Sequence, residues 1–420
     1  MMFDRPIAIS LSPNTDSNDF LIALKSLLDF RFWHTGPHIQ ELTGWFKNYF
    51  QIKNVYFFNS GRSSLYCLLK SFGIGTEDEI IIQGFTCVAV PEPVIWLGAK
   101  PVFVEIDDSL NIDSKLLEKA INHKTRAIIV QHTFGIPANI ITIKKIAQKY
   151  RLLLIEDCAH SLGAALNGKP VGLLADAAFF SFGRDKIISS VMGGAAFLNN
   201  GSKKYQYRFD KIYQDLKKVN NAWLLKQLFH PLAFYFILPL YNWYVGKLLL
   251  YLLIKLHLLT KPVVNIELSG GKPDHYPAKL PNSLARLAVN QLNKLTKMNN
   301  RRREIADTYF KNLKSINNII LPQYDKNAVY LRFNILSDDR DNLYRYFRRH
   351  HILLGKWYSN LIDPNGVDFS RINYTPGSLP KARNFANTCL NLPTYPQLAN
   401  DQVNKIIELF KKYADKSNKK

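Results

Sequence analysis

Between residues 53 and 200 the sequence alternates short runs of β-branched and aromatic residues with stretches of helical periodicity, and this alternation constrains the fold most. Seven runs are expected to be strands: VYFFN, EIIIQ, KPVFVEI, RAIIVQH, LLLIED, AAFFSF and GAAFLNN. SSLYCLLKSFG and IITIKKIAQKY are expected to be helices. Strand, helix and strand in succession predict an α/β fold with a mostly parallel sheet flanked by helices. Ligands of such sheets bind at the carboxyl ends of the strands.

The chain has 420 residues, which exceeds one ordinary hydrophobic core. We therefore predict a large domain over residues 1–275, which carries an insertion at about 203–275, and a smaller α/β domain over residues 276–420. In the smaller domain, helices are expected over 291–313, 341–351 and 401–413, and a strand over 329–336.

The formal net charge of +22 favours anionic partners, namely nucleic acid, an acidic membrane face or a phosphate-bearing substrate. Nucleic-acid binding would rest on charge alone, so we expect none. The four cysteines are scattered without a CxxC pair, and no histidine stands at metal-ligand spacing. The first ten residues lack the pattern of a secretory signal. These features predict a cytoplasmic protein without a structural metal.

The insertion at 203–275 begins with a strongly basic stretch and continues as the apolar run LAFYFILPLYNWYVGKLLLYLLIKLHLL. The uncharged part of this run approaches the length of a transmembrane helix, but Pro231 and Pro239 interrupt it. A single crossing would also place the C-terminal region across the membrane from the sheet on which it must close. Two interpretations stay open: contact with the membrane surface through residues 228–259, or a buried helical hairpin or oligomer contact.

Two strand ends carry polar residues that ask for an explanation. LLLIED stops at Glu156 and Asp157, which either begin an ordinary turn or hold an anion for a cationic ligand. NSGRSSL follows the first strand and opens a helix, where Gly61 permits a tight turn. Ser60 and Ser63 there either complete a phosphate-binding turn with the backbone N–H groups or only cap the helix.

Two further strand ends complete the set of candidates. In FSFGRDK, Ser181 ends a strand and Lys186 follows in a loop, where a lone lysine is usually a solvated charge. QGFTCVAV places Phe85 and Cys87 after another strand. No GxGxxG follows the first strand, which argues against a Rossmann-type dehydrogenase.

The order of these segments resembles that of the DegT-type nucleotide-sugar aminotransferases, which are pyridoxal-phosphate enzymes of fold type I. The resemblance runs through SGRSSL, IIIQGFTCVAVPEPVIWLGAKPVFVEID, IIVQHTFGIPANI, LLLIEDCAHSLGA, AAFFSFGRDK and GGAAF. FWHTGPHIQEL and LNLPTYPQLANDQV resemble the opening and closing motifs of the family. The similarity covers nearly the whole chain apart from the insertion. It implies the fold type I architecture and a homodimer whose active sites are completed across the interface.

The resemblance assigns roles to three residues at the candidate site. Lys186 matches the lysine that forms the Schiff base with the cofactor aldehyde and then moves the proton, which requires a partly deprotonated amine. Asp157 matches the aspartate that pairs with the protonated pyridine nitrogen. His160 matches a residue near the phenolic oxygen of the cofactor.

Further residues match the positions that hold the cofactor phosphate, and these are Gly61, Arg62, Ser63 and Ser181. Arg62 stands where many relatives carry a small hydroxyl residue, and its side chain either adds charge to the phosphate site or points outward.

Other positions depart from the family pattern. Cys87 replaces an aromatic residue that stacks on the cofactor ring, so the ring must rest on this sulfur or on another side chain such as Phe85. Lys279 and Pro277 replace an Arg and an Asn by which the partner subunit contacts the phosphate, and Lys279 is the remaining candidate for that contact. Arg383 and the segment KWYSN replace residues of the family's C-terminal motifs and of its sugar pocket.

These matches predict a homodimeric, cytoplasmic aminotransferase that moves an amino group from glutamate to a nucleotide-linked keto-sugar, for cell-surface polysaccharide or deoxyaminosugar biosynthesis. The insertion would suit an enzyme that works at the inner face of the membrane. One alternative is a sugar dehydratase or lyase with the same cofactor, although relatives of that kind replace the lysine at position 186 by His. A second alternative is a catalytically lapsed family member that acts as a membrane-associated scaffold.

Overall fold

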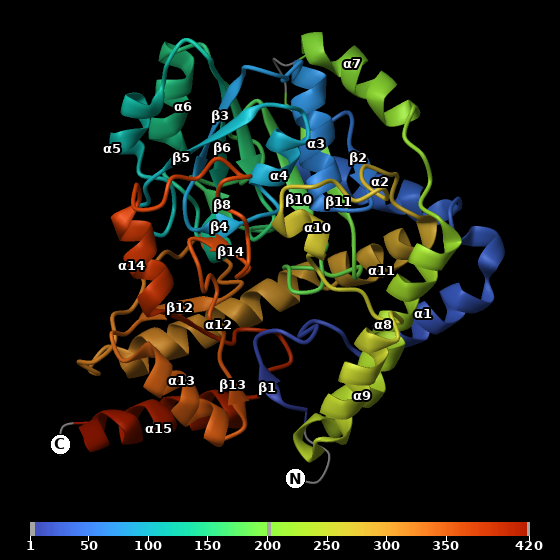
Figure 1. Ribbon diagram of the computed structural model, residues 1–420. Helices are drawn as coiled ribbons and strands as arrows, with labels where there is room; N and C mark the ends of the chain where they lie inside the picture. Colours follow the sequence, from blue (N-terminus) through green and yellow to red (C-terminus); the bar gives the residue numbers. More distant parts are fainter. Residues whose placement is uncertain (1–4, 200–202, 418–420) are drawn as a thin grey trace.

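The centre of the computed structural model is a seven-stranded sheet with the order β2-β11-β10-β7-β6-β3-β5 (Figure 1). The structure describes residues 5–199 and 203–417. The strands are β2 (Tyr56–Phe58), β3 (Glu79–Gln83), β5 (Lys100–Val104), β6 (Thr125–Gln131), β7 (Leu153–Asp157), β10 (Ala177–Ser181) and β11 (Gly194–Leu198). All neighbours are parallel except that β11 runs antiparallel to β10 and β2. The seven predicted strands and the α/β class are confirmed, although the last residue of GAAFLNN lies outside the described residues.

Helices cover both faces of the sheet because its strands are apolar on both sides. Ile80 and Ile82 of β3 belong to the core under α3 (Gly61–Phe72), whereas Ile81 belongs to the core under α6 (Ile140–Lys149). Both helices were predicted. Further helices of this part are α1 (Ser17–Leu28), α2 (Pro37–Phe50), α4 (Pro91–Ile95), α5 (Ser114–Leu117) and α7 (Lys203–Gln214).

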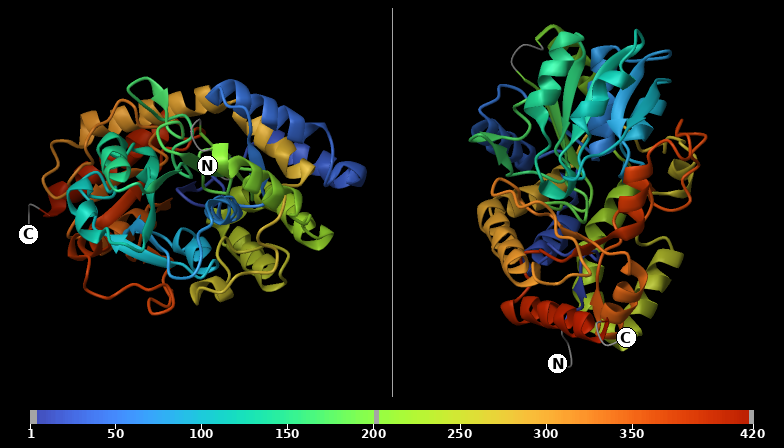
Figure 2. Two further views of the ribbon diagram at one scale, coloured as in Figure 1. Left: turned by 90° about the horizontal axis from the view of Figure 1, so that it is seen from above. Right: turned by 90° about the vertical axis from the view of Figure 1, so that its left-hand side faces the viewer.

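The C-terminal region has a core of its own below the sheet, and α15 lies at the end of the molecule away from the sheet (Figure 2). Its elements are α11 (Asn282–Leu292), α12 (Leu295–Leu313), β12 (Phe333–Leu336), α13 (Arg340–Arg349), β13 (Ile352–Leu353), α14 (Pro380–Thr388), β15 (Cys389–Leu392) and α15 (Asn400–Ser417). The helix predicted from residue 291 instead begins at Leu295, after a break that separates it from α11. The sequence patterns did not predict α14 and β15, which pairs with β12.

Short strand pairs join distant parts of the chain. β1 (Ile7–Ala8) pairs in parallel with β13. β4 (Thr86–Cys87) pairs in parallel with β14 (Ile362–Asp363), and this pairing brings a C-terminal segment to the edge of the large sheet. β8 (Ala165–Leu166) and β9 (Lys169–Pro170) form a hairpin. The division of the chain at residue 275 stays a prediction.

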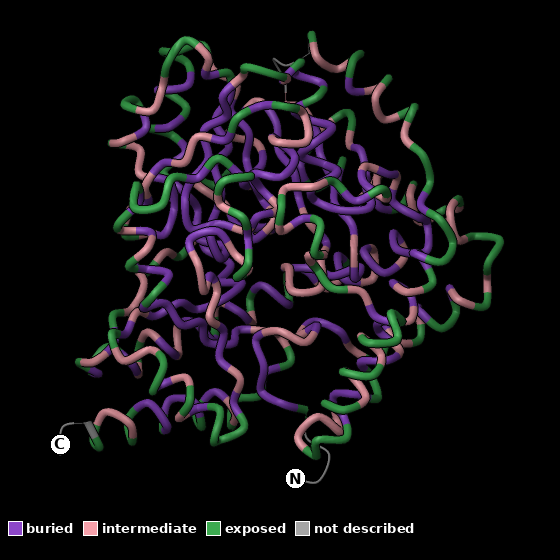
Figure 3. Tube along the Cα trace, viewed as in Figure 1, coloured by how far each residue is buried: buried purple, intermediate pink, exposed green. Residues whose placement is uncertain are grey.

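After α7, which begins the predicted insertion, the insertion contains α8 (Asn221–Leu240), α9 (Val245–Lys255) and α10 (Asn265–Leu268). α8 packs on α1, where the rings of Phe20 and Tyr235 lie 4.4 Å apart. Exposed residues are frequent along α9, whose Leu248 is 58% exposed (Figure 3). Within the described parts of the chain, no helix combines the length and the apolar character needed to cross a bilayer.

Candidate active site

A cavity of about 480 Å³ lies at the carboxyl ends of the central parallel strands. Gln131, Asp157 and Ser181, which end β6, β7 and β10, all line it. Adjacent parallel strands end at one edge of the sheet, and this places polar side chains from distant parts of the sequence around one space. The cavity is therefore where the sequence predicted a site.

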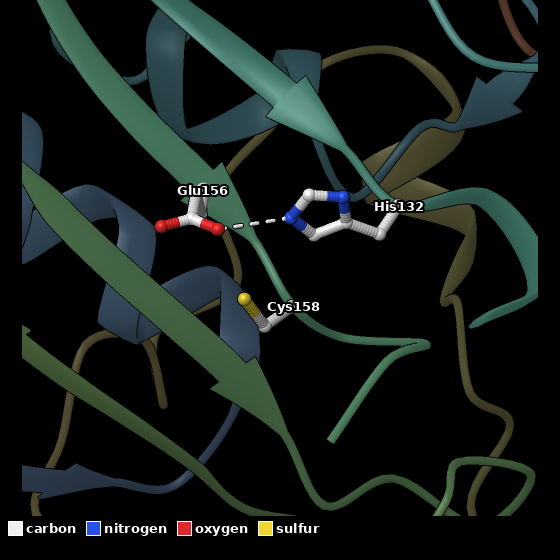
Figure 4. Close-up of side chains that lie close together, drawn as sticks. All are labelled: His132, Glu156 and Cys158. Atoms are coloured by element: carbon white, nitrogen blue, oxygen red, sulfur yellow. Dashed lines mark hydrogen bonds and ion pairs between the residues drawn. The ribbon is translucent and has the colours of Figure 1, made fainter. Parts of the chain in front are cut away.

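Glu156, one of the two carboxylates that end the LLLIED run, is fully buried and saturated with hydrogen bonds. Its Oε1 accepts from the backbone N–H groups of Leu174 at 2.7 Å and Ala175 at 3.0 Å. Its Oε2 accepts from the N–H of Gly172 at 2.8 Å and from Nε2 of His132 at 3.1 Å (Figure 4). Four donors offset the cost of burying this carboxylate, so Glu156 holds the loop after β9 against β7.

His132, Glu156 and Cys158 together resemble a metal-binding cluster, because their ligand atoms lie within 4.8 Å of one another (Figure 4). However, Nδ1 of His132 accepts the N–H of Ala138 at 3.0 Å. The proton of the neutral ring is then on Nε2, which donates it to Glu156. Burial raises the pKa of Cys158 well above its usual value, which disfavours the thiolate that metals bind. These groups satisfy one another and serve as a structural support.

Asp157 is also buried, but its side chain lines the cavity. Its Oδ1 accepts the N–H of Ala159 at 2.9 Å, and this is the one hydrogen bond to its carboxylate from the described residues. Burial raises the pKa of Asp157, while the N–H of Ala159 and the charge of Lys186 act against this rise. A cationic ligand atom beside the carboxylate would offset the desolvation, which makes Asp157 suited to a protonated ring nitrogen.

Lys186 lies within hydrogen-bonding distance of His160, with 2.8 Å between Nζ and Nε2. Nδ1 of His160 accepts the N–H of Phe134 at 3.3 Å, so the ring carries its proton on Nε2 and donates it to the lysine nitrogen. Such a bond requires a neutral amine. Burial lowers the pKa of Lys186, and burial together with the Lys186 charge lowers the pKa of His160 well below its usual value. The environment thus favours the unprotonated lysine that nucleophilic and proton-transfer chemistry needs.

The start of α3 faces the same cavity through Gly61, next to Ser181. Ser60 caps the helix, and its Oγ accepts the N–H of Ser63 at 3.1 Å. The Ser63 hydroxyl donates to Asn59 at 2.7 Å, and Ser63 does not line the cavity. A Cβ at Gly61 would lie 3.0 Å from Cβ of Ser181, so glycine permits this close approach. The first-turn N–H groups and the Ser181 hydroxyl form the candidate phosphate site.

The guanidinium of Arg62 is engaged by groups of the protein itself, so its charge is not directed at the candidate phosphate site. It forms an ion pair with Glu267, and Nη2 donates to the carbonyl of Pro262 at 2.5 Å. A carboxylate oxygen of Glu92 lies 3.8 Å from Nη1. Burial raises the pKa of Glu92 to about 8 although the Arg62 charge opposes this. Arg62 therefore connects the start of α3 to the insertion.

The structure separates the other predicted residues. Cys87 lines the cavity, whereas Phe85 is fully buried beside it and meets Tyr358 edge to face at 5.2 Å. Of the two side chains considered for contact with the cofactor ring, the structure places Cys87 at the cavity. Lys279 donates to the carbonyl of Gln214 at 2.9 Å and does not line the cavity of its own chain. Its predicted contact with the partner subunit's cofactor stays a prediction.

Among the cavity residues that were not predicted, two groups come from outside the large sheet and its loops. Trp357, Tyr358 and Asp363 enter from the C-terminal region, and the Tyr358 ring lies 6.4 Å from the ring of His160 at an interplanar angle of 29°. The segment KWYSN, which replaces residues of the family's sugar pocket, pointed to this wall without assigning contacts. The second group comes from residues 261–268 of the insertion, for which no sequence pattern indicated a place at the site.

A buried lysine whose pKa is lowered and a buried carboxylate lie on one cavity, beside a helix start, as is typical of pyridoxal-phosphate-dependent transferases. The residues fit this cofactor: Asp157 for the ring nitrogen, Lys186 for the reactive carbon, and the start of α3 with Ser181 for the phosphate.

The sequence profile of the DegT/DnrJ/EryC1/StrS aminotransferase family matches residues 14–215 and 274–411. The chain belongs to this family and is a pyridoxal-phosphate-dependent aminotransferase. Residues 216–273 of the insertion lie outside the match.

Relatives and solved structures agree with this assignment. The chain is 24% identical over 393 residues to the GDP-perosamine synthase of Vibrio cholerae, with 90% of this chain and 91% of the relative covered. It is 41% identical over 138 residues to the UDP-N-acetyl-3-dehydro-alpha-D-glucosamine 3-aminotransferase of Acidithiobacillus ferrooxidans, with 32% and 37% covered. The sugar aminotransferase Spr1654 of Streptococcus pneumoniae, solved in its PMP form, is 21% identical, with a TM-score of 0.76 and 99% and 97% of the chains covered. This likeness confirms the predicted fold.

Proposed function

We propose that this aminotransferase delivers an amino group from glutamate to a keto-sugar carried on a nucleoside diphosphate. The observation that carries the proposal is the 2.8 Å contact between Lys186 and His160 on a cavity that Asp157 also lines. These three residues give the site an unprotonated amine, a fixed hydrogen-bond donor and an anion. Such a set can remove and return a proton at a substrate carbon.

Each residue has a separate task in this proposal. The cofactor supplies an electron sink for the bond that breaks at the substrate carbon. Lys186 takes the proton from that carbon and returns it, and burial, which lowers the pKa of its amine, favours this role. The Nε2–H group of His160 orients the amine. Burial lowers the pKa of the His160 ring, which favours its neutral form. Asp157 would hold the protonated ring nitrogen of the cofactor, and Cys87 lines the same cavity.

The substrate class is supported by charge and by the names of relatives. A net charge of +22 suits a substrate with a diphosphate. Two relatives bear the names of enzymes that act in nucleotide-sugar metabolism, a GDP-perosamine synthase and an aminotransferase for a UDP-linked amino sugar. We place the reaction in cell-surface polysaccharide or deoxyaminosugar biosynthesis.

An absorbance spectrum and an amino-transfer assay test the proposal. The purified enzyme should show a visible band that borohydride removes, and glutamate should shift that band. Amino transfer is then measured over a panel of nucleotide-linked 3-keto and 4-keto hexoses. A colourless protein that does not respond to glutamate would support the lapsed scaffold instead, and loss of water from the sugar without amino transfer would support the dehydratase.

We also propose that the enzyme is a homodimer in the cytoplasm and that residues 228–259 contact the inner face of the membrane. From residue 216 to residue 266 the sequence has six lysines and neither Asp nor Glu, which suits anionic lipid. Leu248 and Leu256 are 58% and 64% exposed there, beside Tyr244 at 76%. Such a mixture of apolar, aromatic and basic side chains is typical of surface-bound helices.

Flotation with vesicles tests the membrane contact. The wild type should float with phosphatidylglycerol vesicles more than with phosphatidylcholine vesicles, and the double variant Leu248→Glu, Leu256→Glu should not float. Ile141→Glu on α6, where Ile141 is 42% exposed, is the matched control and should float like the wild type. Equal flotation of both variants would refute the contact, and analytical ultracentrifugation reports the dimer separately.

A further inference from the structure

Part of the insertion folds over the candidate active site of its own chain. Five of its residues line the cavity, namely Lys261, Pro262, Val263, Asn265 and Leu268. They belong to the stretch 216–273, which the family profile leaves unmatched. We call residues 260–268 the cis wall. A segment that is absent from the family's common sequence thus forms part of the surface that a substrate meets.

Arg184 fixes the first end of the cis wall. Its Nη1 donates to the carbonyl of Thr260 and its Nη2 to the Thr260 hydroxyl, both at 2.5 Å. Burial lowers the pKa of Arg184 to about 10, which still leaves the guanidinium charged at neutral pH. Arg184 stands two residues before Lys186 on the loop after β10. The wall is therefore tied to the loop that carries the reactive lysine.

Arg62 fixes the other end. It donates to the carbonyl of Pro262 and pairs with Glu267, whose Oε2 also accepts the N–H of Val264 at 2.8 Å. Arg62 is in the first turn of α3, beside the candidate phosphate site. Two arginines from the family-like motifs thus hold the cis wall at both ends, and the lysine between them lies on the cavity.

The charge of Lys261 is available to a ligand, unlike those of the other cations at the cavity. Arg62 is paired with Glu267, and Arg184 is engaged by Thr260. Lys186 is driven toward its neutral form by burial. Among the described residues, no carboxylate or carbonyl accepts a hydrogen bond from Lys261, which is exposed at the cavity.

We propose that the cis wall is a binding element for a phosphate-bearing ligand and that Lys261 is its contact residue, with Arg62 and Arg184 as positioning residues. The ligand group is the diphosphate of the nucleotide-linked substrate or the 5′-phosphate of the cofactor, which share the same chemistry. The diphosphate case rests on the proposed function. An ammonium group on a flexible stem suits phosphate as a point charge.

Equilibrium binding to the purified enzyme tests Lys261 and separates the two sources. UDP, GDP and dTDP are titrated by calorimetry, and pyridoxal phosphate is titrated into the cofactor-free enzyme by quenching of tryptophan fluorescence. Lys261→Ala should weaken one of the two ligand classes about tenfold, the effect expected for loss of one charge-assisted contact, and Lys261→Arg should restore most of it. Weaker nucleotide binding identifies the substrate diphosphate, and weaker cofactor binding identifies the 5′-phosphate.

Lys255→Ala is the matched control, because Lys255 is an exposed lysine of the same insertion that does not line the cavity. It should bind both classes like the wild type. Unchanged affinity of Lys261→Ala for both classes would overturn the inference. If the wild type binds none of the three nucleotides, the proposed substrate class fails, while the titration with pyridoxal phosphate still tests Lys261.

The anchors are tested with a mild variant. Thr260→Val removes the hydroxyl that accepts from Arg184 and keeps the size of the side chain. It should weaken the same ligand as Lys261→Ala by about threefold, because a loosened wall holds Lys261 less firmly. In the Lys261→Ala background the same change should add almost nothing. Full additivity of the two changes would show that Thr260 acts independently of Lys261 and would overturn the positioning role of Arg184.

Discussion

Glu156 and Asp157 are consecutive residues of β7, yet their carboxylates lie in two different environments. Glu156 receives four hydrogen bonds in a closed cluster with His132. Asp157 receives one from the described residues and faces a cavity that also holds Lys186. Both are buried carboxylates near a histidine, so burial alone does not distinguish support from function. The difference lies in how many of the oxygen lone pairs the protein itself satisfies.

The largest effect should come from Lys186, which lines the same cavity as Asp157. Lys186→Ala should lower kcat at least about 1,000-fold, because the site loses its acceptor for the substrate proton. It should also abolish the visible band that borohydride removes. Lys149→Ala, in which the removed ammonium pairs with Glu118 at the surface, is the control and should keep both properties. Near-normal amino transfer in Lys186→Ala would contradict the assigned site.

In the buried cluster of Glu156 and His132, the variant Glu156→Gln should destabilise the fold and leave the rate of amino transfer nearly unchanged. The amide nitrogen would face N–H donors and leave them without an acceptor, which should cost about 3 kcal/mol in the free energy of unfolding. Chemical denaturation measures this change. Per folded molecule, kcat should stay within about twofold of the wild type. A stable variant with low kcat would place Glu156 in the active site after all.

Asp157→Asn is the isosteric counterpart and should show the opposite pattern. Its kcat should fall about 100-fold, because a neutral amide stabilises the protonated ring nitrogen less than a carboxylate does. The bound cofactor, measured by absorbance after release in alkali, should fall much less than kcat. The free energy of unfolding should change by less than about 1 kcal/mol, since within the described parts of the chain only the Ala159 N–H donates to this side chain. Wild-type activity of this variant would refute the pairing.

Glu92 extends the comparison to a buried carboxyl that has a charged neighbour, Arg62, at 3.8 Å. Neither of its oxygens has a hydrogen-bond partner among the described residues, and its pKa is raised to about 8 by burial. A raised carboxyl pKa means that the folded state holds the proton longer. Its contribution to stability is therefore full below about pH 4.5, the usual value, and is lost as the pH rises through about 8.

Glu92→Gln should remove that pH dependence. Relative to the wild type, the variant should gain about 3 kcal/mol in unfolding free energy between pH 5.5 and pH 8.5. Denaturation curves at the two pH values measure the gain. An equal difference at both pH values would show that Glu92 is already ionised in the folded protein at pH 5.5.

Much of this arrangement could be predicted from the sequence because it depends on local pattern. The apolar runs predicted the seven strands, and the polar residues at their ends indicated Asp157 and Ser181 at one edge of the sheet. The role of Lys186 needed the family resemblance, since a lysine in a loop has no pattern of its own. Most partners of Glu156 could not be predicted, because three of the four are backbone N–H groups of a loop whose path the sequence does not specify.

Two other outcomes depend on geometry that periodicity does not describe. Phe85 has a left-handed backbone conformation with φ of 58°. The regular alternation of side chains along a strand therefore does not hold at this residue. The ring of Phe85 is buried in the core, whereas Cys87 lines the cavity. The cis wall arises from tertiary contacts of Arg62 and Arg184 with a segment far along the chain. The apolar composition of the insertion indicated contact with lipid or a helical hairpin, and it did not indicate that residues from the stretch 261–268 line the cavity.

The pairing of β1 with β13 has a consequence for biosynthesis. Ile7 and Ala8 are translated long before their partners Ile352 and Leu353, which lie far along the chain. The sheet and its loops can assemble while this leading segment still has no place to dock. Weakening the pairing of β1 with β13 should therefore impair a late step of folding, after the large sheet has formed.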